Sequence, residues 1–575
     1  MKTAFRRCVL GLCAVLAAAA LLAACGSPLW AQGSAMQAIG QHLAAGEFPL
    51  ARRLAQQLPA PQRDRVLGQI ARAQAQAGMF GSAVSSLADI GNDRYRSQMA
   101  QELSGQRFSQ AAAGGGVQAD FQQLIDLITR TIEPDTWDPE GQGTVEQFAI
   151  AGGVRIDAGG TVHSVLRSEA GRELLRLQRS QRVDSGNRQV WRSSPLRKVS
   201  LTRLEKYVQL RLALGQEPDE AMRYLAGLTK IQYVFVYPES GDIVLAGPAG
   251  PWTRDELGRV VNADSGRPVL HLDDLVVLLR AMRTDLQAAL LCSIEPEKEN
   301  LVRVQQFLAQ KRRLTPATRR RWVEQIRQRL GWQSVRFQGI DPRTRVAHVM
   351  FEADYRMKLL GIGLEPGPPQ VPSYLEQIRW KRGQKPPAMG MLRWWFNMNY
   401  EAVLASADRN AYALRGQGVE VLSESEMITR QGGLVPAARQ DPLAAAFAAN
   451  FTRHFDHLAA EYHVYADLQN VFDLALVCAL LQAEGIPERV NWNMTCFGDP
   501  QQYPVALGPA PRKVESVANY RVLGGRHVVV AVSGGVRLQP ARYVKQIATD
   551  RRGELSSRRQ GEKPQQLPRG VWWWD

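Results

Sequence analysis

Three side chains near the middle of the C-terminal half have types and spacing that could bind a metal ion. His454, His457 and Glu461 fall at intervals of three and four residues, so one helix would place all three on a single face. His463 follows near the expected end of that helix and would need a bend to join them. The alternative is a set of ordinary helix-surface and helix-end histidines. We favour that alternative and expect no bound metal ion and no cofactor.

A second set of residues could supply acid–base chemistry. Asp273 and Asp274 stand together after His271 and before an apolar run, and Asp242 and Asp354 lie in other segments. Carboxylates from separate segments can converge on one substrate, so a hydrolase acting on an envelope polymer is our alternative function. For Asp273-Asp274 the simpler interpretation is a helix cap, because a carboxylate in the first turn accepts free amide hydrogens. We favour the cap and assign no catalytic residue.

Motifs with a fixed local geometry are missing from the sequence. There is no Gly-x-Ser-x-Gly, no His-Glu-x-x-His, no phosphate-binding loop ending in Gly-Lys-Ser/Thr and no Cys-x-x-Cys. Gly361-Ile-Gly363 follows an expected helix, so we interpret it as a helix stop. Ser533, in Val532-Ser-Gly-Gly-Val, could be exposed on a tight turn, but no base accompanies it locally. We interpret these glycines as turn residues only.

The elements expected around these residues are a hairpin and several amphipathic helices. Two β-rich runs, Ile231–Tyr237 and Asp242–Ala246, are joined by a Pro-Glu-Ser-Gly turn, and an apolar helix begins at Asp273. A three- or four-stranded meander is expected over Met391–Ser423 and a strand over Arg526–Val532. Periodicity predicts further helices over Val199–Leu214, Pro218–Leu228, Pro316–Leu330, Thr344–Leu360, Asp441–Tyr462 and Val464–Glu484. The arginines of the helix over 316–330 could meet anionic lipid, but a solvated outer face is the simpler interpretation.

Residues 36–103 have the pattern of helical hairpins. An Ala-Gly-x-Phe turn before a helix recurs after 32 residues, so that Gly46, Phe48 and Ala51 are repeated as Gly78, Phe80 and Ala83. The pattern resembles tetratricopeptide repeats, in which small residues let neighbouring helices approach and one hairpin buries the next. That resemblance implies a module that presents a surface to partner proteins.

The N-terminus has the features of an export signal. Arg6-Arg7 precede the apolar run Val9–Ala24, which is too short to span a membrane. The run ends in Leu22-Ala-Ala-Cys25-Gly26, which resembles a bacterial lipobox, and Cys25 would carry the lipid. The alternative is ordinary cleavage after Ala31, with Cys25 incidental. We favour lipidation and expect a periplasmic, membrane-anchored lipoprotein, since no later run reaches the length of a membrane-spanning helix.

The net charge of +16, with 59 arginines and 12 lysines, suits an anionic partner or simply a solvated basic surface. Anionic lipid and anionic polymer fit an exported protein, whereas nucleic acid does not, so we expect no nucleic-acid partner. Beyond Cys25 the mature chain keeps Cys292, Cys478 and Cys496, which allow at most one disulfide. Cys478 lies in an apolar helix and is expected to be a buried thiol.

The C-terminal 25 residues form a basic segment with three consecutive tryptophans, Trp572 to Trp574, just before Asp575. The segment is poor in apolar residues, so we expect it to lack structure up to the tryptophans. The tryptophans themselves could sit at a membrane interface or on the protein's own surface, and both alternatives stay open.

Several segments resemble a planctomycete family known as domain of unknown function 1598. The strongest similarity runs from residue 196 to residue 292 and includes Tyr224-Leu-Ala-Gly-Leu, Tyr233-Val-Phe-Val-Tyr-Pro-Glu, Asp242-Ile-Val-Leu-Ala-Gly-Pro-Ala and Gly266-Arg-Pro-Val-Leu. Weaker similarity continues through Ala353-Asp-Tyr-Arg-Met-Lys, Arg393-Trp-Trp-Phe and Val532-Ser-Gly-Gly-Val. A shorter stretch, 124–148, resembles a segment of planctomycete envelope proteins that belongs to small α+β domains akin to secretin periplasmic modules. These resemblances imply a bacterial envelope setting and supply no catalytic residue.

We therefore predict a multidomain α+β protein in which helical hairpins precede mixed α+β domains. The expected segments are a signal peptide (1–24), a helical-repeat domain (25–108), a linker (109–117), a small α+β domain (118–195), the family domain (196–300), a further α+β domain (301–485), a β-containing segment (486–550) and a basic tail (551–575). The expected function is a non-enzymatic, lipid-anchored scaffold that binds other envelope proteins through its helical repeats.

Overall fold

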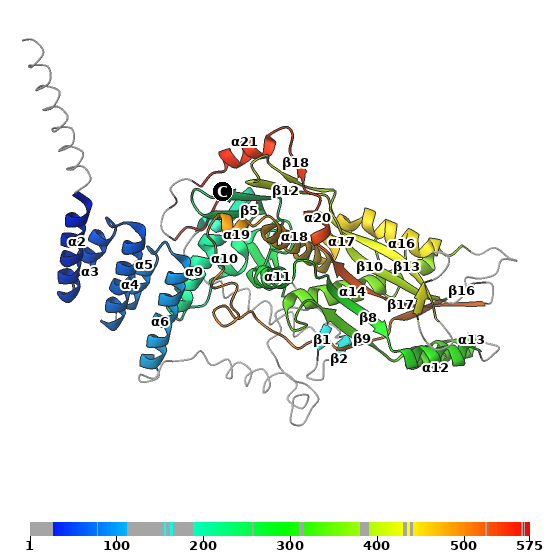
Figure 1. The fold of residues 1–575 in the computed structure, drawn as a ribbon. Helices are drawn as coiled ribbons and strands as arrows, with labels where there is room; N and C mark the ends of the chain where they lie inside the picture. The colour runs from blue at the N-terminus through cyan, green and yellow to red at the C-terminus, as the bar shows by residue number, and fades with distance from the viewer. Residues whose placement is uncertain are drawn as a thin grey trace, which may run out of the picture. The chain divides into compact units, whose positions relative to one another are not determined.

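The structure is a computed structural model of the 575-residue chain. It describes residues 27–77, 79–111, 154–156, 161–164, 188–255, 258–309, 316–379, 390–428, 434–436, 441–523, 526–564, 567 and 570–575. The chain divides into two compact units, one of residues 1–118 with 206–218 and one of residues 119–205 with 219–575. The expected fold class is confirmed: helix pairs come first, and two mixed sheets with interleaved helices follow (Figure 1).

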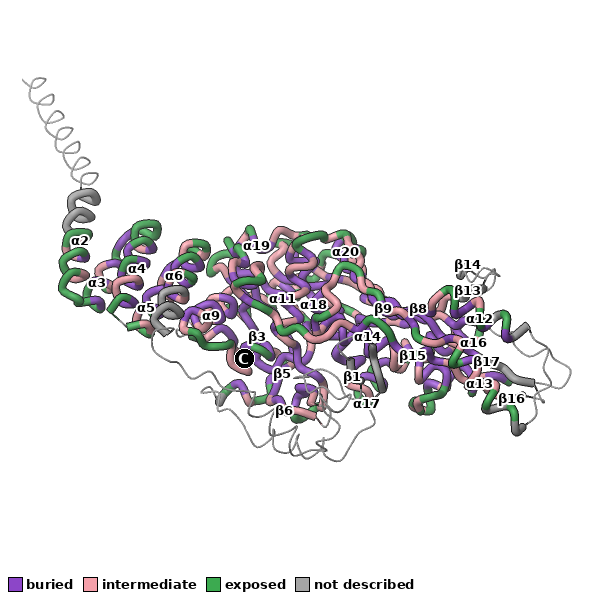
Figure 2. The backbone as a smooth tube through the Cα atoms, turned by 90° about the horizontal axis from the view of Figure 1, so that it is seen from below, coloured by how far each residue is buried: buried purple, intermediate pink, exposed green. Residues whose placement is uncertain are grey.

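The first unit, here called the helical unit, alternates long and short helices. Buried and exposed residues alternate along them (Figure 2). The long helices α2 and α4 end 32 residues apart, at Ala44 and Gln76, and the short helices α3 and α5 both have eight residues and begin 32 residues apart. The elements are α2 (Ser27–Ala44), α3 (Phe48–Ala55), α4 (Ala60–Gln76), α5 (Phe80–Leu87) and α6 (Asp93–Ala111).

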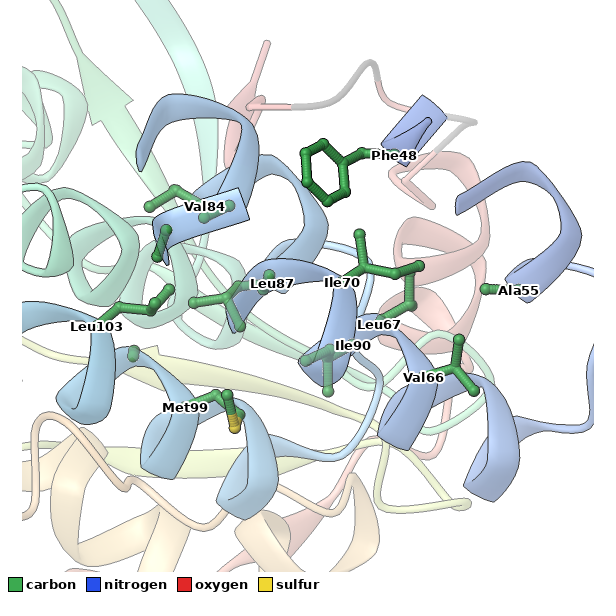
Figure 3. Packing of buried hydrophobic residues seen from close by; sticks show 14 of the residues in the cluster. Phe48, Ala55, Val66, Leu67, Ile70, Val84, Leu87, Ile90, Met99 and Leu103 are labelled. Carbon is green, nitrogen blue, oxygen red and sulfur yellow. The ribbon is translucent and has the colours of Figure 1, made fainter. Parts of the chain in front are cut away.

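The core of the helical unit repeats with the same spacing. Buried residues separated by 32 positions include Ala51 and Ala83, Leu58 and Ile90, Leu67 and Met99, and Ala71 and Leu103. Figure 3 shows several of these side chains meeting between the helices. Gly68 allows the closest approach, because a Cβ there would lie 2.4 Å from the hydroxyl oxygen of Tyr95. The expected helical hairpins are therefore confirmed, while their relation to tetratricopeptide repeats stays a prediction.

The second unit, here called the α+β unit, contains a ten-stranded mixed sheet. Strand β10 pairs in parallel with β17 and antiparallel with β13, and β17 pairs antiparallel with β8 and β16. The main path follows β1 (Val154–Ile156), β2 (Thr161–Ser164), β15 (Lys513–Glu515), β9 (Trp332–Gln338), β8 (Leu290–Pro296), β17 (Arg526–Leu538), β10 (Gly390–Asn399), β13 (Gly418–Ile428) and β14 (Leu434–Pro436), with β16 (Ala518–Leu523) beside β17.

A seven-stranded sheet gathers segments from distant parts of the chain. Its order is β18 (Ala548–Thr549), β11 (Ala402–Ala405), β12 (Ala411–Arg415), β4 (Tyr233–Tyr237), β5 (Asp242–Ala249), β3 (Ser194–Ser200) and β19 (Trp573–Trp574). The expected hairpin is β4–β5, which pairs from Tyr233 with Ala246 to Tyr237 with Asp242. A separate small hairpin follows it, formed by β6 (Trp252–Arg254) and β7 (Val260–Asn262).

The helices between the strands bury the sheets, and α18 (His463–Ala483) is the central one. It is the one described helix long and apolar enough to cross a membrane, contrary to the expectation of none, yet its whole apolar window is buried in protein. Most of α9 (Leu201–Ala213) belongs to the helical unit. The others are α10 (Glu220–Arg223), α11 (Leu272–Thr284), α12 (Lys298–Ala309), α13 (Pro316–Leu330), α14 (Arg345–Gly361), α15 (Tyr374–Gln377), α16 (Pro442–Arg453), α17 (Phe455–Glu461), α19 (Ile486–Arg489), α20 (Ala541–Val544) and α21 (Glu554–Gly561), with short 3₁₀ turns at Arg188–Trp191 and Leu225–Gly227.

Several expected helices are confirmed. The helix predicted over Thr344–Leu360 is α14, and the Thr344 hydroxyl accepts a hydrogen bond from the amide of Ala347, as an N-cap does. It ends at Gly361, and Gly363 has φ +73°, so the predicted helix stop is confirmed. The basic helix over Pro316–Leu330 is α13.

The segment Met391–Ser423, expected to form a three- or four-stranded meander, does contain strands, but they do not form a meander. β10 and β13 pair with each other in the ten-stranded sheet, while β11 and β12 between them pair in the seven-stranded sheet. The chain thus leaves one sheet, completes part of the other and returns. Alternating patterns show where strands lie but not which neighbour each will choose.

Two helix boundaries were wrong because strand pairing and backbone turns override helical periodicity. The helix expected from Val199 begins at Leu201, since Val199 belongs to β3 and pairs with Leu245 and Trp573. The helix expected over Pro218–Leu228 stops after α10, where Leu225 and Ala226 take left-handed φ angles of 45° and 53°. The chain turns back there towards β5.

The basic tail has structure, contrary to expectation. It forms α21, and β19 adds Trp573 and Trp574 to the seven-stranded sheet as partners of Val199 and Lys198. The side chains of Trp572 and Trp573 are buried. The tryptophans therefore dock on the protein's own surface, which was one of the two alternatives.

Candidate functional site

Two of the carboxylates considered for acid–base chemistry, Asp242 and Asp354, are buried and belong to separate ion pairs. Asp242 accepts hydrogen bonds from Arg203 at 2.7 and 2.9 Å. Burial alone would raise the pKa of Asp242, but hydrogen bonds from Arg203 and Ser200 outweigh it and hold that pKa below its usual range. Asp354 lies 2.5 Å from the ammonium nitrogen of Lys358, one turn along α14, and burial raises the pKa of Asp354 to about 6 against the attraction of Lys358.

The predicted cap at Asp273-Asp274 is wrong. Helix α11 begins at Leu272, its N-cap is His271, and no side chain makes a capping hydrogen bond there. Asp273 instead accepts hydrogen bonds from the hydroxyl of Tyr503, at 2.8 Å, and from the amide of Ala506, at 3.2 Å. Asp274 pairs with Arg345. Both carboxylates therefore hold distant segments against the start of α11.

Asp274 begins a buried chain of five charged residues, here called the ion chain: Asp274, Arg345, Asp467, Arg259 and Glu352. Arg345 is the first residue of α14. Its guanidinium donates hydrogen bonds to Asp274 and, at 2.5 Å, to Asp467 on α18. The other carboxylate oxygen of Asp467 accepts from Arg259 at 3.2 Å, and Arg259 also donates to Glu352. No side chain in the ion chain is more than 14% exposed, so it joins α11, α14, α18 and the β6–β7 hairpin inside the protein.

Burial and mutual attraction shift the pKa values of the ion chain. Burial raises the pKa of Asp274 to about 6, although Arg345 opposes the shift. Burial would lower the pKa of Arg345, but Asp274 and Asp467 outweigh it and raise that pKa. Burial and the nearby cations Arg345 and Arg254 lower the pKa of His271, which therefore stays neutral. Three carboxylates face two guanidinium groups, so the ion chain is neutral when Asp274 holds a proton.

The ion chain can exchange one proton near neutral pH, and its main effect is to fix the elements it joins. Losing one partner of a buried ion pair leaves an uncompensated charge, so each residue restrains the others. His271 Nε2, Asp274 Oδ1 and Arg259 Nε are buried without a hydrogen-bond partner, as atoms that bind ordered water often are. Sequence reasoning singled out Asp274 but missed the other four residues, which lie far apart along the chain and follow no local pattern.

The three candidate ligands expected on one helix, His454, His457 and Glu461, do not share a helix. His454 lies in the break between α16 and α17, with φ −105° and ψ 20°, so the predicted single helix over Asp441–Tyr462 is wrong. His457 and Glu461 are in α17, and the His454 and His457 rings are 6.3 Å apart. His463 begins α18, where its ring bonds to Asp255 at 2.9 Å. Within the described ranges, no three His, Cys, Asp or Glu residues are grouped so that they could hold a metal ion.

Ser533 lies in the middle of β17 and not on a tight turn, so that prediction is wrong. Its register partner on β10 is Arg393, and the next pair is Trp394 with Gly534. Gly534 has φ +131°, and a Cβ there would lie 1.8 Å from the carbonyl oxygen of Trp394. The glycine is thus required by close strand packing. Ser533 has no exposed area, and the Arg393 guanidinium reaches across β17 to Glu295 on β8 at 2.9 Å.

The three cysteines beyond Cys25 are free and buried, which confirms the expected buried thiol at Cys478. Burial raises the pKa of the Cys478 thiol. In the basic helix α13, Arg327 pairs with Glu324 and Glu515, and the Arg329 guanidinium lies 3.9 Å from the ring centroid of Phe307. Those two arginines have partners within the protein. Cys25 and the stretch 124–148 lie outside the described residues.

Comparison with known families identifies one segment. A family model described as protein of unknown function (DUF1598) matches residues 292–374, from β8 to the beginning of α15. The match lies downstream of the stretch 196–292, where the sequence resemblance was strongest, and includes the motif that begins at Ala353. No curated protein and no solved structure matches the chain. The segment thus matches a family model whose description names no activity.

The motifs that carried the weaker resemblance meet in the ten-stranded sheet. Arg393-Trp-Trp-Phe on β10 and Ser533-Gly-Gly-Val on β17 are register partners along their whole length. The third motif lies on α14, whose Lys358 ammonium is 3.4 Å from the carbonyl oxygen of Ile294 on β8. A Cβ at Gly361, the last residue of α14, would lie 2.3 Å from the indole of Trp394. Close packing of α14 against three strands explains why these small and aromatic residues occur together.

Proposed function

We propose that the protein is an exported, lipid-anchored interaction protein of the bacterial cell envelope and acts without catalysis. The observation that carries this proposal is the 32-residue repeat in the core of the helical unit. Stacked helix pairs of this kind bury one face and leave extended surfaces for partner proteins.

The anchor in this proposal is Cys25. Its support is the sequence alone: the basic Arg6-Arg7, the apolar run to Ala24 and the lipobox-like residues around Cys25. A lipid on Cys25 would leave all described residues outside the membrane, which agrees with the complete burial of α18 in protein.

The non-catalytic part of the proposal is supported by the partners of the candidate acids. Asp242 and Asp354 are buried and pair with Arg203 and Lys358, and Asp273 accepts hydrogen bonds from a tyrosine hydroxyl and a backbone amide. A carboxylate committed to such partners must give them up before it can act on a substrate, at a cost in stability.

The partner surface is assigned to the N-terminal ends of the short helices. Leu50, in the first turn of α3, is 42% exposed, and Met79, just before α5, is 46% exposed. The positions 32 residues away hold Ser82 and Glu47, so each exposed apolar side chain departs from the residue that the other repeat carries. Exposed apolar side chains in a repeat module are candidates for contact with a partner.

The test is crosslinking in living cells followed by recovery of the full chain through a C-terminal tag. We expect one envelope protein near stoichiometry, and its loss in the double variant Leu50→Ser with Met79→Glu. These replacements copy residues from the other repeat, so the helical fold should be kept, which circular dichroism would verify. The matched control is Leu364→Ser, which changes a 51% exposed leucine of the α+β unit. Recovery of the protein alone, or equal recovery from the double variant and wild type, would contradict the assignment.

The anchor has its own test. Cys25→Ser should release the protein from the membrane pellet into the soluble fraction after a high-salt wash, while the wild-type chain stays in the pellet. A Cys25→Ser chain that remains with the membrane would overturn the anchor and leave the partner test unaffected.

A further inference from the structure

One face of the ten-stranded sheet has a charged site that the proposed function does not use. Side chains alternate between the two faces of β10. Trp394 packs against Phe447 of α16 with ring centroids 4.5 Å apart, so Arg393 and Trp395 lie on the face opposite α16. The arginine–tryptophan site consists of Arg393, Trp395, Glu424 and Arg537.

The glycine beside Trp395 makes room for its ring. Trp395 is the register partner of Gly535 on β17, and a Cβ at Gly535 would lie 2.8 Å from the indole. Arg393 comes from the row before Trp395 and Arg537 from the row after it. Their guanidinium carbons lie 4.9 and 4.7 Å from the indole centroid. Attraction to the indole thus holds two cations close to one ring.

The two arginines are not equally neutralised by the protein. Arg393 pairs with Glu295 at 2.9 Å and approaches Glu424 at 3.7 Å. Arg537 approaches Glu424 at 3.9 Å. Glu424 is 43% exposed, and an exposed pair at such distances contributes little. Arg537, itself one-third exposed, therefore keeps most of its capacity to bind an anion.

Hydrogen-bonding atoms of the same face are left without partners. The indole N–H of Trp395, the hydroxyl of Ser533 and the side-chain oxygen of Asn397 are buried and have no hydrogen-bond partner. Trp395 is 2% exposed and Ser533 fully buried. Native proteins rarely leave buried donors unsatisfied, so an acceptor from outside the chain is expected at the indole.

We infer that the arginine–tryptophan site binds an oxyanion, a carboxylate or phosphate group of a ligand, against Arg537 and the Trp395 indole N–H. A guanidinium offers two parallel N–H groups that match the two oxygens of either anion. Glu424, exposed and weakly held, moves aside when the oxyanion arrives. The inference concerns the α+β unit alone and does not rest on the membrane anchor or on the helical unit.

The test is a titration of the full chain labelled with ¹⁵N-tryptophan, followed at the indole resonance that Trp395→Phe removes. Inorganic phosphate and galacturonate are the probes, one for each oxyanion. We expect a saturable shift of the Trp395 indole resonance with at least one of them. Arg537→Gln should weaken binding about tenfold, because it removes a charge-assisted hydrogen bond. Glu424→Gln should bind a few-fold tighter, because the competing carboxylate is gone.

The matched control is Arg336→Gln, which removes an exposed arginine on β9 and should leave binding unchanged. A response to phosphate alone would identify a phosphate ligand, and a response to galacturonate alone would identify an acidic sugar, and both support the inference. No shift with either probe would overturn it. So would an Arg537→Gln variant, shown to be folded by its melting curve, that binds as wild type does. Because Glu424→Gln is expected to gain affinity, a general loss of folding cannot imitate its effect.

Discussion

Arg197 and Asp575 form a two-pronged ion pair across 378 residues of sequence, with nitrogen–oxygen distances of 2.8 and 3.0 Å. The Arg197 side chain has no exposed area and also donates to the carbonyl oxygens of Val190 and Ala226, both at 2.8 Å. Its guanidinium lies 4.6 Å from the ring centroid of Trp573. The final residues thus supply the counter-charge of a buried cation and add a strand to a sheet. No periodicity in the basic tail indicated either of these roles.

Asp575→Ala should lower the free energy of unfolding by about 1–3 kcal/mol, because a buried cation loses its counter-charge. The measurement is urea unfolding followed by circular dichroism. The control is Glu554→Ala, whose pair with Arg552 is exposed on both sides and lies at 3.7 Å, and which should change little. Equal effects of the two substitutions would show that the Asp575 contact adds nothing.

Arg345→Met should destabilise the α+β unit by about 3–5 kcal/mol, because Asp274 and Asp467 would remain buried without their cation. Arg345→Lys should lie between wild type and Arg345→Met, since one ammonium cannot serve two carboxylates as a guanidinium does. Arg343→Met, two residues earlier, removes a pair with half-exposed Asp341 and is the control. Thermal melting of the three variants would rank them. Equal losses at positions 343 and 345 would contradict a restraining role for the ion chain.

Asp473→Asn should flatten the dependence of stability on pH. Burial raises the pKa of Asp473 to about 6, so the folded protein holds this proton more tightly than the unfolded chain. The resulting stability is complete below pH 4 and is lost as the pH rises through 6, a change of about 3 kcal/mol. Asparagine cannot ionise, and its oxygen can still accept the 2.7 Å hydrogen bond from the Tyr400 hydroxyl. Melting temperatures at pH 5 and pH 8 should therefore differ less in the variant.

Asp242→Asn is the opposite case and the control for Asp473→Asn. The pKa of Asp242 is lowered, so its stabilising effect is present at neutral pH and lost as the pH falls through that pKa. The variant should be destabilised most near pH 7. If both variants kept the wild-type slope between pH 5 and pH 8, the carboxyl at 473 would not be the group that titrates.

Two glycine-to-alanine substitutions should change the stability of the protein in opposite directions. Gly361→Ala places a Cβ 2.3 Å from the buried Trp394 indole and should cost about 1–3 kcal/mol of stability through overpacking. Gly81→Ala, inside α5, meets no atom within 4 Å and should add about 0.5–1 kcal/mol, because alanine favours the helix. Unfolding midpoints in urea would measure both. A neutral Gly361→Ala would mean that α14 is free to move away from β10.

Local features of this fold could be predicted from the sequence. These features depend on neighbours within a few positions or on exact repetition. They include the 32-residue spacing of Phe48 and Phe80, the β4–β5 hairpin, the Thr344 cap and the stop at Gly363. Such features carry their signal in residue type and period.

Long-range pairing could not be predicted in the same way. Asp273 has the type and position of a helix cap, yet Tyr503 and Ala506 compete for it from 230 and 233 residues away. The two glycines after Ser533 have the composition of a turn, yet they permit strand contact with Trp394 and Trp395. In each case the local preference is weak, and a partner that only the folded chain brings near overrides it.

The interlacing of the two sheets means that the family-matched segment 292–374 is not an autonomous folding unit. Its strands β8 and β9 sit inside a sheet whose remaining members come from both sides of the segment, and β8 pairs with β17 more than 150 residues later. Expressed as a fragment, the segment would expose unpaired strand edges and aggregate. Contacts this distant in sequence also slow folding, because a long loop must close before the stabilising contact can form. A soluble fragment that contains the matched segment and all strands of both sheets therefore has to run from β1 to β19.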